Sequence, residues 1–429
     1  MSKVYIYPKG VTGEQLGWCM EYVDGVCPEY IDDDIKGRNF NDLKERIALE
    51  KGIIYIALSR LSPKYKLNLE TIVEKIKREK IDYILGGMEE YAQKAIYKLG
   101  NECARKGWNA ICALILPDFV KDKHFGFLEE ELKKRRVKVL LFCSQRGSYE
   151  RALERLDEEN QCLLYLSYEF LPLLDFPKVI CVTGTYQYHK NVKVIYVGHG
   201  IVDWNVNGRI QAVLGNDVCV VGREFMPKKA DSITRFLPIG YLGYDKIAKD
   251  FSSTKMLVKE SVLFTPYDLG ELERMIPSIK EVLERFSVIL RYRYEWEDSH
   301  LQYLEQFLDH QKFTIDNSNP MSLESYQKSF CLVCSKTTSK FSFPLVTLCP
   351  SVVVEHNQEG YDQDIGELGV NVSLIGGGGL LAIVSKIYQN LNKWNKKILE
   401  YRKREIYNYG KASEYLASYL TSEYGLNEE

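Results

Sequence analysis

Short apolar runs alternate with amphipathic segments along the first half of the chain, and this alternation is the main signal for its fold. The runs lie at residues 3–7, 52–58, 82–87, 109–116, 137–143, 161–167, 178–184 and 193–200. Between several of them lie helical patterns such as LNLETIVEKIKREK and EYAQKAIYKLGNECARKG. Strands that are apolar almost throughout are typical of a parallel sheet with helices on both faces. The first half is therefore predicted to be α/β.

The second half repeats this scheme. Strands are predicted at 217–222, 233–240, 261–268, 287–293, 312–316, 329–335 and 350–356, an amphipathic helix at 270–286, and charged helices from 380 to about 422. Two Rossmann-like domains with parallel sheets facing a central cleft, followed by C-terminal helices, form the GT-B plan. We expect an N-terminal acceptor-side domain at 1–215, a nucleotide-donor domain at 216–395 and a helical tail at 396–429.

Composition narrows the class of protein. A chain of 429 residues exceeds what one hydrophobic core usually supports, which favours two domains. The net charge of −2 gives no support for nucleic-acid binding. Most of the eleven cysteines lie in apolar runs, as reduced core residues do. There is no signal-peptide core and no run of eighteen apolar residues, so a cytoplasmic protein is predicted. Peripheral contact with the inner face of the membrane, through basic clusters at 133–136 and 402–404, stays open.

The stretch FCLVCSKTTSKFSF at 330–343 is the strongest candidate for binding chemistry. It is predicted to be a buried strand, a hydroxyl-rich loop and the start of a helix. The free N–H groups of a helix N-terminus suit a phosphate, and loop hydroxyls add donors. N-capping is the structural alternative for the same hydroxyls. The predicted phosphate-binding residues are Ser335, Thr337, Thr338 and Ser339, with added charge from Lys336 and Lys340.

Further polar residues follow the ends of predicted strands in the second half, where nucleotides bind in such sheets. The predicted donor contacts are Arg291 and Arg293 for phosphate, Tyr267 and Asp268 for the nucleotide, and Glu355 and His356 for the ribose hydroxyls. Surface arginines beyond a strand are the alternative for the first pair.

His199 is the predicted general base. It ends a predicted strand between Gly198 and Gly200, which exposes its side chain at the carboxyl edge of the sheet. Asp203 is the candidate that orients the imidazole. A turn histidine and a helix-capping aspartate are the structural alternatives.

The loop PKGVTG after the first strand is the predicted acceptor-side element, with Lys9, Gly10, Thr12 and Gly13 as its binding residues. Its spacing does not match the glycine-rich loops that bind ATP or nicotinamide nucleotides. No metal or cofactor is predicted. Cys331 and Cys334 lack the second pair that a zinc site needs, and the aspartates at 32–34 are interpreted as a solvated turn.

The order of these motifs resembles one family, the bacterial CDP-glycerol glycerophosphotransferases, which are GT-B enzymes that build teichoic-acid and capsule polymers. The similar segments are VGHG, LPIGYLGYDKI, VLFTPYD and FCLVCSKTTSKFSF followed by PLVTLCPSVVVEHN, over roughly residues 190–360. The family's motifs would fall on His199–Gly200, on Pro238, Gly240 and Asp245, on Pro266, and on Ser335 to Thr338. The resemblance implies that His199 is the base and that Thr337 and Thr338 bind donor phosphate.

Three positions depart from the family's pattern. Ser335 stands where the family has an aspartate, Leu269 and Gly270 replace an arginine or tryptophan, and residues 292–294 replace an expected His-Pro. The family's groups at these positions are expected to touch the donor. A sugar carried by a cytidine nucleotide therefore fits the sequence at least as well as glycerol phosphate.

The predicted function is that of a GT-B glycosyltransferase in bacterial surface polysaccharide or lipopolysaccharide assembly. His199 would deprotonate a hydroxyl of a glycan or lipid-linked glycan acceptor, and the helix start after Ser335 would stabilise the departing nucleotide without a metal ion. Three alternatives stay open: a CDP-polyol phosphotransferase, a nucleotide-sugar 2-epimerase, and a non-catalytic module of a polysaccharide-synthesis complex.

Overall fold

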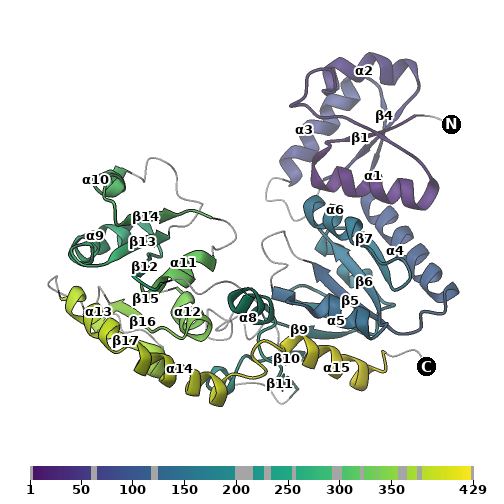
Figure 1. Cartoon of the computed structure of the whole chain (residues 1–429). Helices are drawn as coiled ribbons and strands as arrows, with labels where there is room; N and C mark the ends of the chain where they lie inside the picture. The colour runs from purple at the N-terminus through teal and green to yellow at the C-terminus, as the bar shows by residue number, and fades with distance from the viewer. Residues whose placement is uncertain are drawn as a thin grey trace. The chain divides into compact units, whose positions relative to one another are not determined.

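The chain folds into two compact units (Figure 1). The first comprises Met1–Asp122, Glu129–Tyr196 and Ala417–Glu429, and the second comprises Lys123–Leu128 and Val197–Leu416. The chain passes from the first unit to the second after Tyr196, whereas the predicted limit is 215. The described helices after 395 are distributed over both units, whereas a separate tail is predicted. The computed structural model describes residues 3–58, 65–116, 124–198, 216–226, 233–253, 258–291, 302–318, 323–335, 337–355, 365–373 and 379–426.

The first unit begins with a four-stranded parallel sheet in the order β2-β1-β3-β4. Its strands are β1 (Val4–Tyr7), β2 (Glu29–Tyr30), β3 (Ile53–Ile56) and β4 (Asp82–Leu85), and the helices of this part are α1 (Gly10–Asp24), α2 (Phe40–Leu49), α3 (Tyr65–Arg78) and α4 (Gly87–Arg105). Tyr5, Tyr7, Ile54 and Ile56 pack with apolar residues of α2 and α3 in one core. The outer strand β4 keeps both its end residues exposed, so the sheet stops there.

A second set of parallel strands in this unit follows the order β9-β8-β5-β6-β7. The elements are β5 (Ile111–Leu116), α5 (Leu128–Lys134), β6 (Lys138–Cys143), α6 (Arg146–Glu154), β7 (Gln161–Tyr165), η2 (Tyr168–Leu173), β8 (Val179–Val182) and β9 (Lys193–Tyr196). Every residue of β5 and β8 is buried, as expected for central strands covered on both faces. The N-terminal part of the chain is thus built on two groups of parallel strands, where the sequence predicted one Rossmann-like sheet.

The second unit holds a six-stranded sheet in the order β14-β13-β12-β15-β16-β17. Its strands are β12 (Ser261–Thr265), β13 (Ser287–Arg291), β14 (Phe313–Asp316), β15 (Ser329–Cys334), β16 (Ser351–Glu355) and β17 (Gly369–Ser373), all paired parallel. The shorter strands β10 (Asp217–Cys219) and β11 (Arg235–Leu237) pair with each other.

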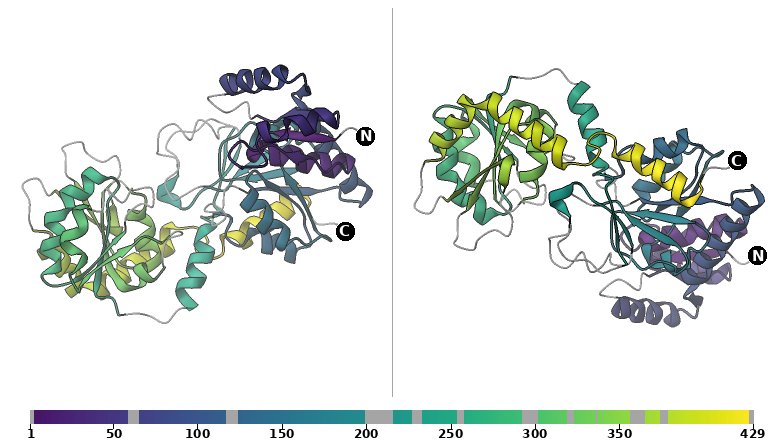
Figure 2. Two further views of the ribbon diagram at one scale, coloured as in Figure 1. Left: turned by 90° about the horizontal axis from the view of Figure 1, so that it is seen from above. Right: turned by 90° about the horizontal axis from the view of Figure 1, so that it is seen from below.

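Helices cover both faces of the six-stranded sheet (Figures 1 and 2). On one face lie α9 (Leu269–Leu283) and α13 (Leu380–Gln389), and on the other lie α12 (Ser339–Thr347) and α14 (Leu391–Glu405). The other helices described after residue 222 are η4 (Arg223–Phe225), α8 (Gly243–Ser253), α10 (Glu305–Leu308), α11 (Leu323–Lys328), η6 (Gly366–Leu368) and α15 (Ala412–Tyr424), and the last of these ends in the first unit. Alternate residues of β12 face opposite sides: Val262 and Phe264 pack with α9 and α13, while Leu263 packs with α12 and α14.

The predicted α/β class with parallel sheets and C-terminal helices is confirmed. The central cleft of the GT-B plan depends on how the two units are placed, and it stays a prediction. No helix in the described ranges is both long and apolar enough to cross a bilayer.

Candidate functional site

The candidate site lies at the switch point of the six-stranded sheet. From β12 the chain moves outward to β13 and β14, whereas from β15 it moves the other way to β16 and β17. The strands β12 and β15 are therefore neighbours, and Thr265 is paired with Cys334 at their carboxyl ends. Helices α9 and α12 both begin just beyond these ends. Ligands of open α/β sheets bind at such a point, outside the carboxyl ends of the strands.

The loop after β12 is held by two acidic side chains. Asp268 is the N-cap of α9, and its Oδ1 accepts a hydrogen bond from the Glu271 N–H at 2.8 Å. Glu271 Oε2 in turn accepts from the Tyr267 N–H at 2.7 Å. The Tyr267 side chain is 46% exposed. Of the two predicted nucleotide contacts in this loop, Tyr267 is thus presented at the surface, while Asp268 already serves the helix.

Glu271 is a site residue that the sequence analysis missed. It is 2% exposed, and within the described structure its Oε1 has no hydrogen-bond partner. Burial raises the pKa of its carboxyl, and hydrogen bonds from the Ser335 side chain and the Tyr267 backbone lower the pKa only in part. The buried Thr265 Oγ1, at the end of β12, is also without a partner among the described residues. The Asp-x-x-Glu spacing at a helix start is the sequence signal that points to Glu271.

Two threonines of the hydroxyl loop differ in whether their side chains bond to the start of α12. Thr337 Oγ1 accepts from the Ser339 N–H at 3.0 Å, so it closes the turn into α12. Thr338 occupies the N-cap position of α12 but makes no side-chain capping bond to this helix. Ser335 is buried beside Glu271. Lys340 is also buried, with its Nζ 5.1 Å from the centre of the Phe341 ring.

Arg291 lies one strand away from the switch point and is already engaged. Its Nη1 donates to Asp316 Oδ2 at 3.2 Å, and its Nη2 donates to the Ser318 carbonyl oxygen at 3.4 Å. Asp316 also accepts from the hydroxyls of Ser318 and Ser325. Burial raises the pKa of Asp316, but the hydrogen bonds from both serines and the charge of Arg291 outweigh burial and leave the pKa below its usual value.

The remaining predicted residues of the second unit are placed as follows. Glu355 is the last residue of β16, opposite Ser373. Lys336, Arg293, His356, the predicted base His199 and Asp203 lie outside the described residues. Their roles stay predictions.

The predicted acceptor loop forms the start of α1. Gly10 is the first residue of this helix, Thr12 is half-buried, and Lys9 Nζ lies 3.8 Å from Glu14 Oε1. A Cβ at Gly13 would clash with the Pro8 carbonyl oxygen. Gly13 is therefore required for the close packing of the helix on the loop before it, which is a structural reason for this glycine.

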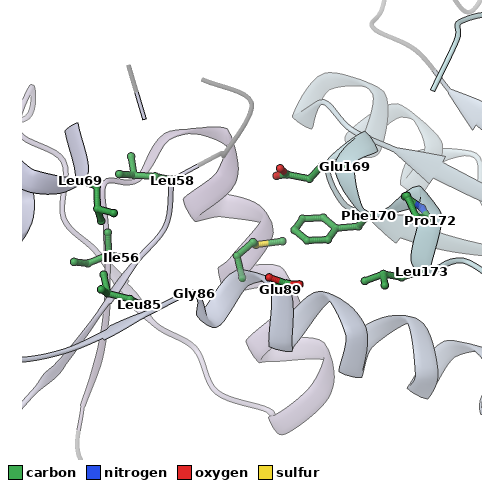
Figure 3. A pocket seen from close by; sticks show the side chains of 11 residues that line it. Ile56, Leu58, Leu69, Leu85, Gly86, Glu89, Glu169, Phe170, Pro172 and Leu173 are labelled. Atoms are coloured by element: carbon green, nitrogen blue, oxygen red, sulfur yellow. The ribbon is translucent and has the colours of Figure 1, made fainter. Parts of the chain in front are cut away.

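A pocket of about 290 Å³ lies in the first unit (Figure 3). Ile56 and Leu58 from the end of β3, Leu69 from α3 and Leu85 from β4 form one side, and Phe170 and Leu173 of η2 form the other. Gly86, in a left-handed conformation with φ of 75°, turns the chain from β4 directly into α4 beneath the pocket. The pocket therefore opens at the carboxyl ends of β3 and β4, on the same edge of the sheet as the start of α1.

No protein-family model matches the sequence, and no curated protein matches it. Among solved structures, the chain is similar to the wall teichoic acid polymerase TagF, with 14% identity and a TM-score of 0.49 over 86% of this chain and 99% of that chain. It is also similar to MurG of Acinetobacter baumannii, with 9% identity and a TM-score of 0.43 over 73% of this chain and 99% of that chain. A putative UDP-N-acetylglucosamine 2-epimerase from Listeria monocytogenes matches with 10% identity and a TM-score of 0.44 over 100% and 98%. These likenesses carry no argument for a shared activity.

Proposed function

We propose that this chain is a GT-B glycosyltransferase that moves a sugar from a nucleotide-activated donor to an acceptor hydroxyl. A cytidine nucleotide is favoured, on the motif resemblance. One observation carries the proposal: helix α12 begins at the switch point of the second unit's sheet, directly after β15, and no side chain caps its N-terminus. The N–H groups and the dipole of this helix start favour a negative charge, as a nucleotide diphosphate provides.

The described residues have distinct roles in this proposal. Thr338 supplies a hydroxyl that α12 does not use for capping. Glu271 is a positioning residue, because it lies beneath the loops and holds the Tyr267 N–H and the Ser335 side chain. The N-terminus of α12 stabilises the phosphate charge that develops as the sugar leaves, so the proposed reaction needs no metal ion. His199 remains the proposed base for the acceptor hydroxyl. The proposed process is the assembly of a bacterial surface polysaccharide.

Thermal unfolding in the presence of CMP, CDP, UDP, GDP or ADP at millimolar concentration tests the donor site. A ligand that binds only the folded state raises the melting temperature. We expect one of the five to do so, and we expect the shift to shrink strongly in Thr338→Ala. Thr314, exposed on the edge strand β14, offers the matched control: Thr314→Ala should keep the full shift. If no nucleotide shifts the wild-type melting temperature, the proposal is wrong and the non-catalytic alternative gains.

Product analysis separates sugar transfer from polyol-phosphate transfer. With a CDP-linked donor, sugar transfer releases the nucleoside diphosphate, whereas polyol-phosphate transfer releases CMP and leaves a phosphate in the product. Release of CMP with phosphate retained would replace the proposed reaction by the second one at the same site. Activity in the presence of EDTA is the test of metal independence, and loss of activity would contradict it. His199→Ala should abolish turnover while the nucleotide-dependent thermal shift is kept.

A further inference from the structure

The pocket of the first unit has a lining unlike that of a phosphate site. Its walls are aliphatic and aromatic side chains from β3, α3, β4 and η2 (Figure 3). Leu85 contributes to this wall and is still 51% exposed, at the end of the edge strand β4. A half-exposed leucine at the mouth of an apolar pocket gains further burial when an apolar group enters.

The charged residues of the pocket are acidic. Glu89, in the first turn of α4, and Glu169, in η2, contribute carboxylates, and none of the described residues that line it is basic. The described lining therefore offers an apolar wall to an aliphatic group and no cation to a phosphate, in contrast to the helix N-terminus at the switch point of the second unit.

We propose that this pocket binds an uncharged aliphatic group that forms part of the acceptor. The assignment of this group to the acceptor rests on the proposed function, whereas the binding of an aliphatic group does not. A volume of about 290 Å³ is at the low end for a small-molecule site, so it holds a portion of a ligand and not a whole glycolipid. The position at the carboxyl edge of the first sheet, beside the start of α1, suits an acceptor-side subsite.

A chain-length series of neutral glycosides tests the proposal without any donor. Methyl, butyl, hexyl and octyl glucoside are titrated below their micellar concentrations, and binding is followed by calorimetry or by chemical-shift changes. Each added methylene that becomes buried contributes a constant increment, so affinity should rise roughly tenfold for every two methylenes. Affinity that does not depend on chain length would overturn the proposal.

Two substitutions of exposed leucines in the first unit link the binding to the pocket. Leu85→Ser should lower the affinity for octyl glucoside about tenfold, because the wall loses its apolar contact. Leu49→Ser is the matched control, since Leu49 at the end of α2 is 85% exposed and does not line the pocket. Equal losses in both variants, or no loss in either, would contradict binding at this site.

The preference for an uncharged ligand is tested with octyl phosphate. We expect it to bind more weakly than octyl glucoside, because none of the described residues that line the pocket is basic. Octyl phosphate binding as tightly as octyl glucoside to the wild type would overturn the assignment of an uncharged ligand. These readouts use no nucleotide, so failure of the donor site to bind CMP or CDP leaves them unaffected, and the two failures are distinguishable.

Discussion

The switch point of the second unit and the pocket of the first unit lie at the same kind of place, the carboxyl edge of a parallel sheet, but they differ in what surrounds a ligand. At the switch point, two helix N-termini, a hydroxyl loop and a buried carboxyl come together. At the pocket, aliphatic side chains and two carboxylates line the space. The first is proposed to bind a phosphate, and the second is proposed to bind an uncharged aliphatic group.

In the proposed function, this difference assigns the donor to the second unit and the acceptor to the first. The sheet topology provides the location in both units, and the side chains after each strand decide the ligand class. A transferase needs this division, because a donor leaving group carries concentrated charge while an acceptor is held by its own neutral surface. The following predictions test whether each feature serves binding or only the fold.

The largest expected effect is at Asp316. Its substitution tests whether Arg291 has a structural role or is available to a ligand. Asp316→Ala removes the acceptor of the Ser318 and Ser325 hydroxyls as well as the partner of the half-buried Arg291, so it should lower the free energy of unfolding by about 3 kcal/mol. Urea denaturation measures this effect. Asp309→Ala, in an exposed turn of the same unit, is the control and should change the free energy of unfolding by less than about 0.5 kcal/mol. A similar small effect at Asp316 would mean that Arg291 is available for phosphate after all.

Glu271 is expected to show the next largest effect. Glu271→Ala leaves the Tyr267 N–H without its acceptor and should cost about 2 kcal/mol of unfolding free energy. Glu271→Gln keeps an acceptor and removes the charge. Because burial raises the pKa of Glu271, its contribution to stability is fully present at acidic pH and is lost as the pH rises. The stability of the wild type relative to Glu271→Gln should therefore fall as the pH rises from about 4, near the ordinary pKa of a glutamate, toward neutrality. A difference that does not change with pH would contradict a perturbed carboxyl.

The sequence predicted the strands well because a buried parallel strand is apolar along its whole length, as in β5 and β15. It did not predict that the N-terminal strands form two groups. Strand pairing depends on which strand lies at the edge of a sheet, and in β4 only the exposed end residues Asp82 and Leu85 distinguish it from a central strand. Hydroxyls after β15 were found from their spacing. Glu271 was not, because a glutamate in an amphipathic helix is usually solvated and only the neighbouring strand reveals its burial.

The apolar pocket could not be predicted from the sequence either. Its lining residues are spread from Ile56 to Leu173, in segments that each resemble ordinary core. Periodicity shows which side chains face away from water, but it does not show where two buried faces fail to meet. Only the packing of η2 opposite the ends of β3 and β4 exposes the pocket (Figure 3).

The smallest expected effect distinguishes two residues at equivalent helix starts. Asp268 caps α9 through its carboxylate, so Asp268→Ala should cost about 1 kcal/mol of unfolding free energy. Thr338 stands at the same position of α12 without a capping bond, so Thr338→Ala should change stability by less than about 0.5 kcal/mol. In the nucleotide titration the order should reverse, with the larger loss of affinity in Thr338→Ala. In the proposed function, the exposed Thr338 hydroxyl contacts the donor phosphate at the N-terminus of α12. Loss of stability without loss of nucleotide affinity in Thr338→Ala would instead make it a second cap.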